Sequence, residues 1–172
     1  MEKLKIYFAG PWFCAAQAER EERLKAKLRE LGFDVHSPKE DSNITGSFMD
    51  PAYRKAVFES NVKHIDDVDI IFGVTDGKQC INNEPDQQGK PTQAIDSGTI
   101  FECGYAYALR CARGDRPIII YYAETLGKMP FNLMLQESAD IVITDFADMD
   151  NLPRYVEEAK RGIRKTHNGI TE

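Results

Sequence analysis

The chain has 172 residues, 42% of them hydrophobic and 29% charged, which is the composition of a folded domain with a core rather than of a disordered chain. Its formal net charge of −6 argues against a nucleic-acid backbone as a partner. No apolar run approaches the roughly 20 residues that a membrane span requires. We therefore expect one cytoplasmic domain over residues 1–172 that binds neither nucleic acid nor membrane.

The cysteines and histidines are spaced too irregularly to indicate a metal site. No CxxC pair or histidine cluster is present, which favours reduced thiols over a disulfide framework and isolated, structural histidines over ligands. The residues are Cys14, Cys80, Cys103, Cys111, His36, His64 and His167. The glycine-rich signatures of dinucleotide and ATP sites are also missing, so no cofactor is expected.

The first part of the chain alternates predicted strands and helices. Residues 4–10 have the pattern of a buried strand that ends in a loop. Leucines at helical spacing predict an amphipathic helix over residues 15–31, stopped by Gly32, and residues 33–38 predict a short strand. The polar residues 39–49 are predicted to form a loop.

A second helix and a central strand follow. Asp50 is suited to cap a helix with Pro51 at its first position, and we expect this helix to end near Asp67. Residues 68–74 form a continuous apolar run, typical of a parallel strand covered on both faces. Residues 75–95 are polar and rich in Gly, Pro, Asn and Gln, and we interpret this long loop as a flap beside a functional site.

The alternation continues to the end of the chain and indicates the fold class. The remaining predictions are strands over 116–122 and 140–144, a turn over 127–130, one or two helical turns over 132–136, an amphipathic helix over 152–164 and a polar tail over 165–172. Together the elements predict an α/β fold, a doubly wound (flavodoxin- or Rossmann-like) three-layer sandwich with a five-stranded parallel sheet. Ligands bind such sheets at the carboxyl ends of the strands, which gathers residues 10–13 and 96–102 at one edge.

Two carboxylates, Asp96 and Glu102, flank the start of another predicted helix. Gly98 can turn the chain and Thr99 can cap the helix, which would place Glu102 in the first helical turn. There the helix dipole would favour an ionised carboxylate, which suits a nucleophile. Gly104 is a costly residue inside a helix and suggests that a strand or ligand approaches the backbone closely.

These segments resemble the nucleoside 2-deoxyribosyltransferase family. The resemblance rests on residues 6–13, 69–74, 96–105 and 130–134, which occur in the family's order. It implies an enzyme of nucleoside salvage that moves 2-deoxyribose from a 2′-deoxyribonucleoside to an acceptor nucleobase. The reaction would pass through a covalent deoxyribosyl-enzyme with retention at C1′, without a metal or cofactor.

The resemblance also implies roles for individual residues. Glu102 would be the nucleophile, Asp96 would contact the base and handle its proton, and Tyr7 would hold the nucleophile by a hydrogen bond. The residues implied in substrate binding are Gly10, Trp12, Phe13, Asn61 and Gly98. Asn132 and Met134 correspond to a pair that completes a neighbouring subunit's site, which implies a homo-oligomer, a hexamer or a dimer.

Two other functions remain open from the sequence. A deoxynucleoside 5′-monophosphate N-glycosidase of the same fold would use water in place of the acceptor base, although Asn132 suits a free 5′-hydroxyl better than a phosphate. A non-catalytic nucleotide-sensing module would use Glu102 only as a hydrogen-bond partner. Asn61 stands where some relatives carry a base-contacting aspartate, which leaves open whether the enzyme uses purines alone or pyrimidines as well.

Overall fold

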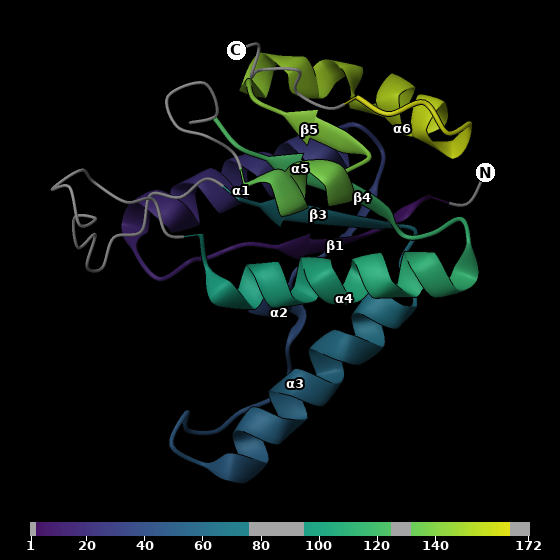
Figure 1. Cartoon of the computed structure of the whole chain (residues 1–172). Coiled ribbons are helices and arrows are strands. Elements are labelled where there is room, and N and C mark those ends of the chain that lie inside the picture. The colour runs from purple at the N-terminus through teal and green to yellow at the C-terminus, as the bar shows by residue number, and fades with distance from the viewer. Residues whose placement is uncertain (1–2, 76–94, 125–131, 166–172) are drawn as a thin grey trace, which may run out of the picture.

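A five-stranded parallel sheet forms the centre of the computed structural model, which describes residues 3–75, 95–124 and 132–165 (Figure 1). In chain order the elements are β1 (Lys5–Ala9), α1 (Ala15–Glu30), β2 (Asp34–His36), α2 (Pro38–Asp41), α3 (Pro51–Asp66), β3 (Ile70–Val74), α4 (Ser97–Arg113), β4 (Ile118–Tyr122), α5 (Leu133–Ser138), β5 (Ile141–Ile143), a 3-10 helix η1 (Phe146–Asn151) and α6 (Leu152–Lys160). The strand order is β2-β1-β3-β4-β5. This doubly wound order confirms the predicted fold class.

Helices cover both faces of the sheet and produce the three predicted layers (Figure 1). On one face, Leu24 of α1 and Leu152 of α6 pack into a cluster with Phe8 of β1. On the other face, Ile65 of α3 packs into a cluster with Tyr7 of β1, which α4 also joins. Neighbouring residues of a strand point to opposite faces, so β1 contributes Phe8 to one layer and Tyr7 to the other.

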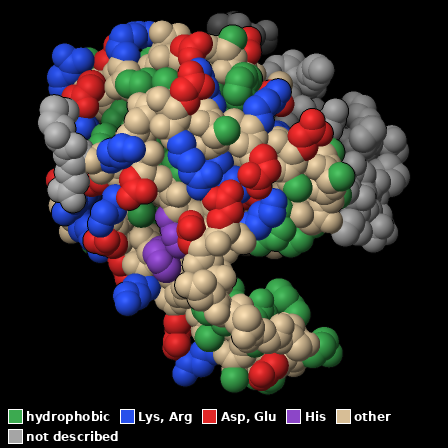
Figure 2. Space-filling view, turned by 180° about the vertical axis from the view of Figure 1, so that it is seen from behind, with side chains coloured by type: hydrophobic (Ala, Val, Ile, Leu, Met, Phe, Trp, Pro, Cys, Tyr) green, Lys and Arg blue, Asp and Glu red, His purple; other side chains and the backbone are tan. Residues whose placement is uncertain are grey.

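Helix α3 projects from the body as an arm, which we call the α3 arm (Figures 1 and 2). Asp50 caps its start by accepting a hydrogen bond from the Ala52 N–H at 2.8 Å, and Pro51 occupies the first position, as predicted. Ile65, near the other end, is completely buried against the sheet, whereas Phe58 in the middle is 53% exposed. The arm is therefore anchored at its carboxyl end.

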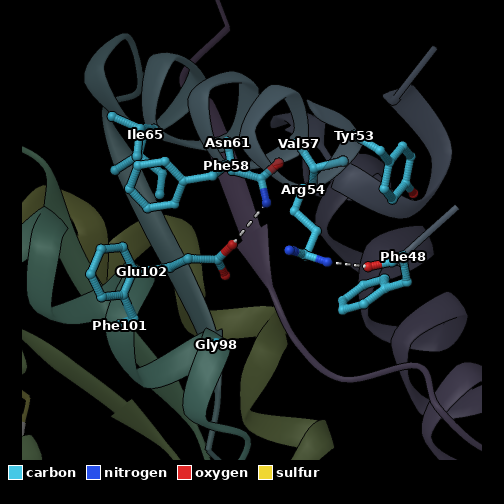
Figure 3. A pocket seen from close by; sticks show the side chains of 11 residues that line it. Phe48, Tyr53, Arg54, Val57, Phe58, Asn61, Ile65, Gly98, Phe101 and Glu102 are labelled. Carbon is cyan, nitrogen blue, oxygen red and sulfur yellow. Dashed lines mark hydrogen bonds between the residues drawn. The ribbon is translucent and has the colours of Figure 1, made fainter. Parts of the chain in front are cut away.

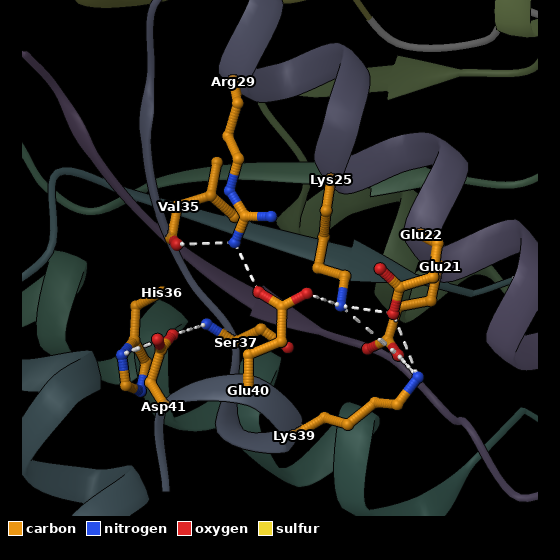
Figure 4. A network of polar contacts seen from close by, with 10 residues as sticks. All are labelled: Glu21, Glu22, Lys25, Arg29, Val35, His36, Ser37, Lys39, Glu40 and Asp41. Atoms are coloured by element: carbon orange, nitrogen blue, oxygen red, sulfur yellow. Dashed lines mark hydrogen bonds and ion pairs between the residues drawn. The ribbon is translucent and has the colours of Figure 1, made fainter.

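The segment 39–49, predicted to be a loop, begins inside the short helix α2. Polar contacts hold this helix against α1 (Figure 4). Lys25 of α1 donates to Glu22 at 3.0 Å and to Glu40 of α2 at 2.6 Å, and Arg29 donates to the same Glu40 carboxylate. The loop prediction was wrong for residues 39–41, because these polar side chains pair across two helices, and it is confirmed for residues 42–49, which form no helix or strand.

Lys25 is the centre of this network, and its side chain is completely buried. Burial alone would lower its pKa, but hydrogen bonds to Glu40 and Glu22 and the nearby Glu21 carboxylate outweigh burial and raise the pKa. The pKa of Glu40 falls to about 2, chiefly through its hydrogen bond from Arg29. The ion pairs that hold α2 therefore persist through the neutral pH range.

Some predictions at the end of the chain and at the cysteines need correction. The 3-10 helix η1 was not predicted, and α6 ends at Lys160. Lys165, predicted to begin the polar tail, is held by β5, because the Val142 N–H donates to its carbonyl at 2.8 Å.

Cys14 is disulfide-bonded, contrary to the expectation of reduced thiols, whereas Cys103 and Cys111 are free.

Several predictions concern segments that the structure does not describe. The proposed flap over 75–95, apart from its first and last residues, the turn over 127–130 and the tail after residue 165 lie outside the described residues. Within the described ranges, no helix combines the length and the apolar character needed to cross a membrane.

Candidate active site

Glu102 of α4 is the residue at which three separate elements meet. The Tyr7 hydroxyl of β1 donates to Glu102 Oε1 at 2.6 Å. Asn61 of the α3 arm donates from Nδ2 to the same oxygen at 3.3 Å (Figure 3). Among the described residues no donor is bonded to Oε2. One oxygen of the carboxylate is therefore held in place, and the other can meet a ligand.

The start of α4 differs from the prediction. Asp96, not Thr99, is the N-cap: its Oδ2 accepts from the Thr99 N–H at 2.7 Å and from the Thr99 hydroxyl at 3.0 Å. The helix begins at Ser97, so Glu102 is its sixth residue and lies in the second turn, beyond the unpaired N–H groups. Gly98 lies inside the helix, with no positive φ, and does not turn the chain.

Burial, rather than the helix dipole, determines the charge of Glu102. It raises the pKa of Glu102 to about 7, with the Asp96 carboxylate adding to the rise and the hydrogen bonds from Tyr7 and Asn61 opposing it. The expectation of a carboxylate ionised by the dipole is thus wrong, because the group titrates near neutral pH. Burial and the adjoining Glu102 raise the pKa of Tyr7 far above its ordinary value, so Tyr7 remains a donor.

A glycine of β3 allows α4 to come close enough to the sheet for Glu102 to reach Tyr7. A Cβ on Gly73 of β3 would lie 2.5 Å from the Sγ of Cys103, so no larger residue fits without a shift. Cys103 is completely buried, and burial raises the pKa of its thiol, as expected for a core thiol. Gly104 has open space among the described residues where its Cβ would be, so the close approach predicted there occurs instead between Gly73 and Cys103.

An apolar pocket of about 340 Å³ opens beside Glu102, between the α3 arm and α4 (Figure 3). Phe58 and Phe101 form one wall, with ring centroids 5.8 Å apart. The pocket is also lined by Tyr53, Val57, Ile65 and Gly98. Its volume is in the range of small-molecule sites, and apolar walls with few polar groups are typical of them.

The aromatic wall was missed by the sequence analysis, although a signal was present. Phe58 and Phe101 are each 53% exposed, on helix positions that an amphipathic pattern assigns to solvent. Large apolar residues at such positions often mark a binding or contact surface. The sequence could not show that the two side chains face one another.

The structure brings together only some of the residues expected at the site. Tyr7 and Asn61 both donate to Glu102, and Gly98 lines the pocket beside it. Asp96 stands at the start of the helix that carries Glu102.

The other expected residues lie elsewhere. Gly10 follows the carboxyl end of β1, where a Cβ would lie 3.1 Å from Phe8. Beyond it, Trp12 and Phe13 are 36% and 63% exposed, with ring centroids 5.9 Å apart. The remaining pair is on α5: Asn132 caps this helix by accepting from the Met134 N–H at 2.9 Å, and Met134 is 71% exposed. None of these residues lines the pocket beside Glu102.

The histidines are arranged differently from the scattered pattern that was expected. His36 and His64 stack, with ring centroids 3.8 Å apart. Within residues 3–75, 95–124 and 132–165, no group of three or more His, Cys, Asp or Glu side chains could hold a metal ion.

The family model of the nucleoside 2-deoxyribosyltransferases matches residues 6–152, which include Tyr7, Asn61, Asp96, Glu102 and the α5 residues. The chain belongs to the nucleoside 2-deoxyribosyltransferase family. Membership of this family indicates an enzyme of glycosyl transfer of the deoxyribosyltransferase type.

Solved structures agree with this assignment. The chain is similar to a 2-deoxyribosyltransferase from Bacillus psychrosaccharolyticus, with 25% identity over 95% of this chain and 98% of that one and a TM-score of 0.69. A conserved protein from Enterococcus faecalis V583 shares the fold, at 18% identity, 92% and 99% coverage and a TM-score of 0.62. A CMP N-glycosidase from Clostridium botulinum is more distant, at 16% identity, 88% and 98% coverage and a TM-score of 0.49, and carries no functional argument. No curated protein matches the chain in sequence.

Replacing Glu102 with glutamine should stabilise this deoxyribosyltransferase-family protein at pH 8. The pKa of Glu102 in the folded protein, about 7, exceeds the ordinary 4.5, so stability falls as pH rises between these two values and the full loss is present above pH 7. Glu102→Gln should therefore raise the melting temperature at pH 8 and change it much less at pH 5. Glu157→Gln is the control, since Glu157 is 64% exposed. Scanning fluorimetry would contradict the raised pKa of Glu102 if Glu102→Gln changed the melting temperature equally at both pH values.

Proposed function

We propose that the protein transfers 2-deoxyribose from a 2′-deoxyribonucleoside to an acceptor nucleobase through a covalent ester on Glu102. The observation that carries this proposal is the asymmetric carboxylate: Oε1 accepts from Tyr7 and Asn61, whereas Oε2 accepts from no described residue, and Glu102 lines an apolar pocket. The similarity to the 2-deoxyribosyltransferase of Bacillus psychrosaccharolyticus supports the same chemistry.

In the first step, Oε2 of Glu102 attacks C1′ on the face opposite the base. The C1′–O bond forms as the C1′–N bond breaks, and the bonding electron pair leaves with the base. Positive charge develops at C1′ in the transition state, and the carboxylate below the ring stabilises it. Asp96 is assigned the base-side role, in which a carboxyl group gives the departing base its proton.

The second step reverses the first with a different base. The acceptor nitrogen attacks C1′ and gives its proton back to Asp96, while the ester bond breaks and Oε2 recovers its electron pair; two inversions give retention at C1′. During both steps Oε1 remains the carbonyl oxygen of the ester. As the ester breaks, negative charge returns to the carboxylate. The hydrogen bonds from Tyr7 and Asn61 stabilise this charge and so assist departure of the sugar.

The α5 residues are assigned to the site of a neighbouring subunit. Asn132 and Met134 do not line the pocket of their own chain, and Leu133 and Met134 are 68% and 71% exposed. Exposed apolar side chains of this size are typical of contact surfaces. We assign to Asn132 a hydrogen bond to the sugar 5′-hydroxyl of the adjacent site. Gly10, Trp12 and Phe13 are assigned to the base, in a cytoplasmic enzyme of nucleoside salvage.

Transfer and hydrolysis can be separated with one substrate pair. We expect deoxyinosine and adenine to yield deoxyadenosine and hypoxanthine, measured by liquid chromatography. Free hypoxanthine and deoxyribose without deoxyadenosine would identify the hydrolase instead. Binding of nucleosides without turnover would identify a sensing module. Thymidine as donor then tests whether pyrimidines are used, which Asn61 leaves open.

The shared site predicts that the protein assembles in solution. Light scattering should give a mass that is a multiple of the 19.5 kDa of one chain. Met134→Asp, which places a charge on the exposed α5 surface, should reduce this mass and the transfer rate together. An active monomer would contradict the assignment of Asn132 to a neighbouring site.

A further inference from the structure

His36 of β2 and His64 of the α3 arm stack face to face, with ring centroids 3.8 Å apart and planes inclined by 10°. Figure 2 shows the histidine side chains gathered at the surface where the arm joins the body. The proposed chemistry of Glu102 assigns them no role. Because the buried Ile65 anchors the arm at this end, a contact here affects how the arm sits on the sheet.

A hydrogen bond fixes the proton on the His64 ring, and a carboxylate adjoins the His36 ring. His64 Nδ1 lies 2.7 Å from the Ser60 carbonyl oxygen, so this nitrogen carries the hydrogen and donates it. His36 Nδ1 lies 3.3 Å from Asp41 Oδ2, which is within ion-pair distance when the ring is protonated. On His64, Nε2 is therefore the position at which a further proton adds. Two protonated rings would repel strongly at this separation, in an environment less polar than water.

Charged groups from every neighbouring element face the stack. The groove beside it is lined by the carboxylates Asp34, Asp41, Glu59 and Asp67 and by the cations Lys5 and Lys63. Lys5 is paired with Asp67 at 2.8 Å. Burial and the neighbouring His64 lower the pKa of His36, although Asp41 and Asp34 oppose this. The excess of carboxylates can support one proton on the pair, but the stacked geometry disfavours two.

The stack adjoins one of the residues that hold Glu102 and shares a helix with the other. Tyr7 is the direct cross-strand partner of His36, and the two rings lie 5.8 Å apart. On the α3 arm, Asn61 precedes His64 by one helical turn, so the two share a face of the helix. Tyr7 and Asn61 are the two donors to Oε1 of Glu102. Displacement of the rings would therefore move both donors.

We propose that His36 and His64 form a positioning pair: their stack seats the α3 arm so that Asn61 and Tyr7 hold Glu102, and protonation of both rings releases the arm. The proposal rests on the proposed role of Glu102 as nucleophile. The pair touches neither substrate nor the reacting atoms, and it acts through Asn61 and Tyr7. Below neutral pH, the transfer rate therefore falls more steeply with pH than protonation of Glu102 alone would cause.

The pH profile of kcat/KM for deoxyribosyl transfer tests the pair. Protonation of Glu102 alone lowers the rate about tenfold per pH unit below its pKa. In the unaltered protein we expect the fall to steepen to about a hundredfold per unit or more at lower pH, because protonation of the pair adds to that of Glu102. His64→Phe keeps a stacked ring that cannot be protonated, so the fall should stay near tenfold per unit down to pH 4.5.

Lys63→Gln is the matched control, because it changes the charge of the same groove by one unit without altering the stack. It should retain the steep limb. If His64→Phe does not fold, His36→Phe serves in the same comparison. A tenfold fall throughout in the unaltered protein, or a steep fall that survives removal of the titrating ring, would overturn the proposal.

A nuclear magnetic resonance titration tests the pair without any substrate. The side-chain amide of Asn61 should shift in two steps as pH falls, first with Glu102 and then with the histidines, and in only the first step in His64→Phe. The His36 imidazole should titrate at a higher pH in His64→Phe than in the unaltered protein. If transfer activity is absent but both shifts occur, the proposed function fails and the pair stands. A single step in the unaltered protein would overturn the pair.

Discussion

The hydrogen bond from the Tyr7 hydroxyl to Glu102, at 2.6 Å, is the contact on which the site depends. A carboxylate taken out of water loses solvation that its new partners must replace. Here Tyr7 and Asn61 replace it in part, at Oε1, and burial raises the pKa of Glu102 to about 7. The group is thus ionised readily near neutral pH and is under-solvated, a condition that favours bond formation at the other oxygen.

This contact requires three elements to converge, and each does so for an identifiable reason. Helix α4 approaches the sheet because Gly73 leaves room for Cys103, the residue next to Glu102. Strand β1 presents Tyr7 on the face that α4 covers. The α3 arm brings Asn61, and its anchored end rests on the buried Ile65 and on the stacked histidines. The geometry around Glu102 is therefore a property of the packing of one face of the sheet.

Features set by neighbouring residues, such as strands and helix starts, could be predicted from the sequence. Contacts between residues far apart in the chain could not. The apolar run before Val74 and the cap at Asp50 identified a central strand and a helix start, because each is set by neighbouring residues. Asp96 and Thr99 are both good capping residues, so one hydrogen bond decided where Glu102 falls in its helix. No periodicity could show that His36 would stack on His64. The roles of Glu102 and Tyr7 came from family resemblance, and the structure adds the contact between them.

The central claim is that Glu102 becomes covalently bound to the sugar, and mass spectrometry tests this most directly. The protein would be mixed with deoxyinosine without an acceptor base, quenched in acid and digested. The account predicts a mass increase of one deoxyribosyl group on the peptide that contains Glu102, and its loss after adenine is added before the quench. A deoxyribosyl group on another residue, or none while transfer proceeds, would contradict it.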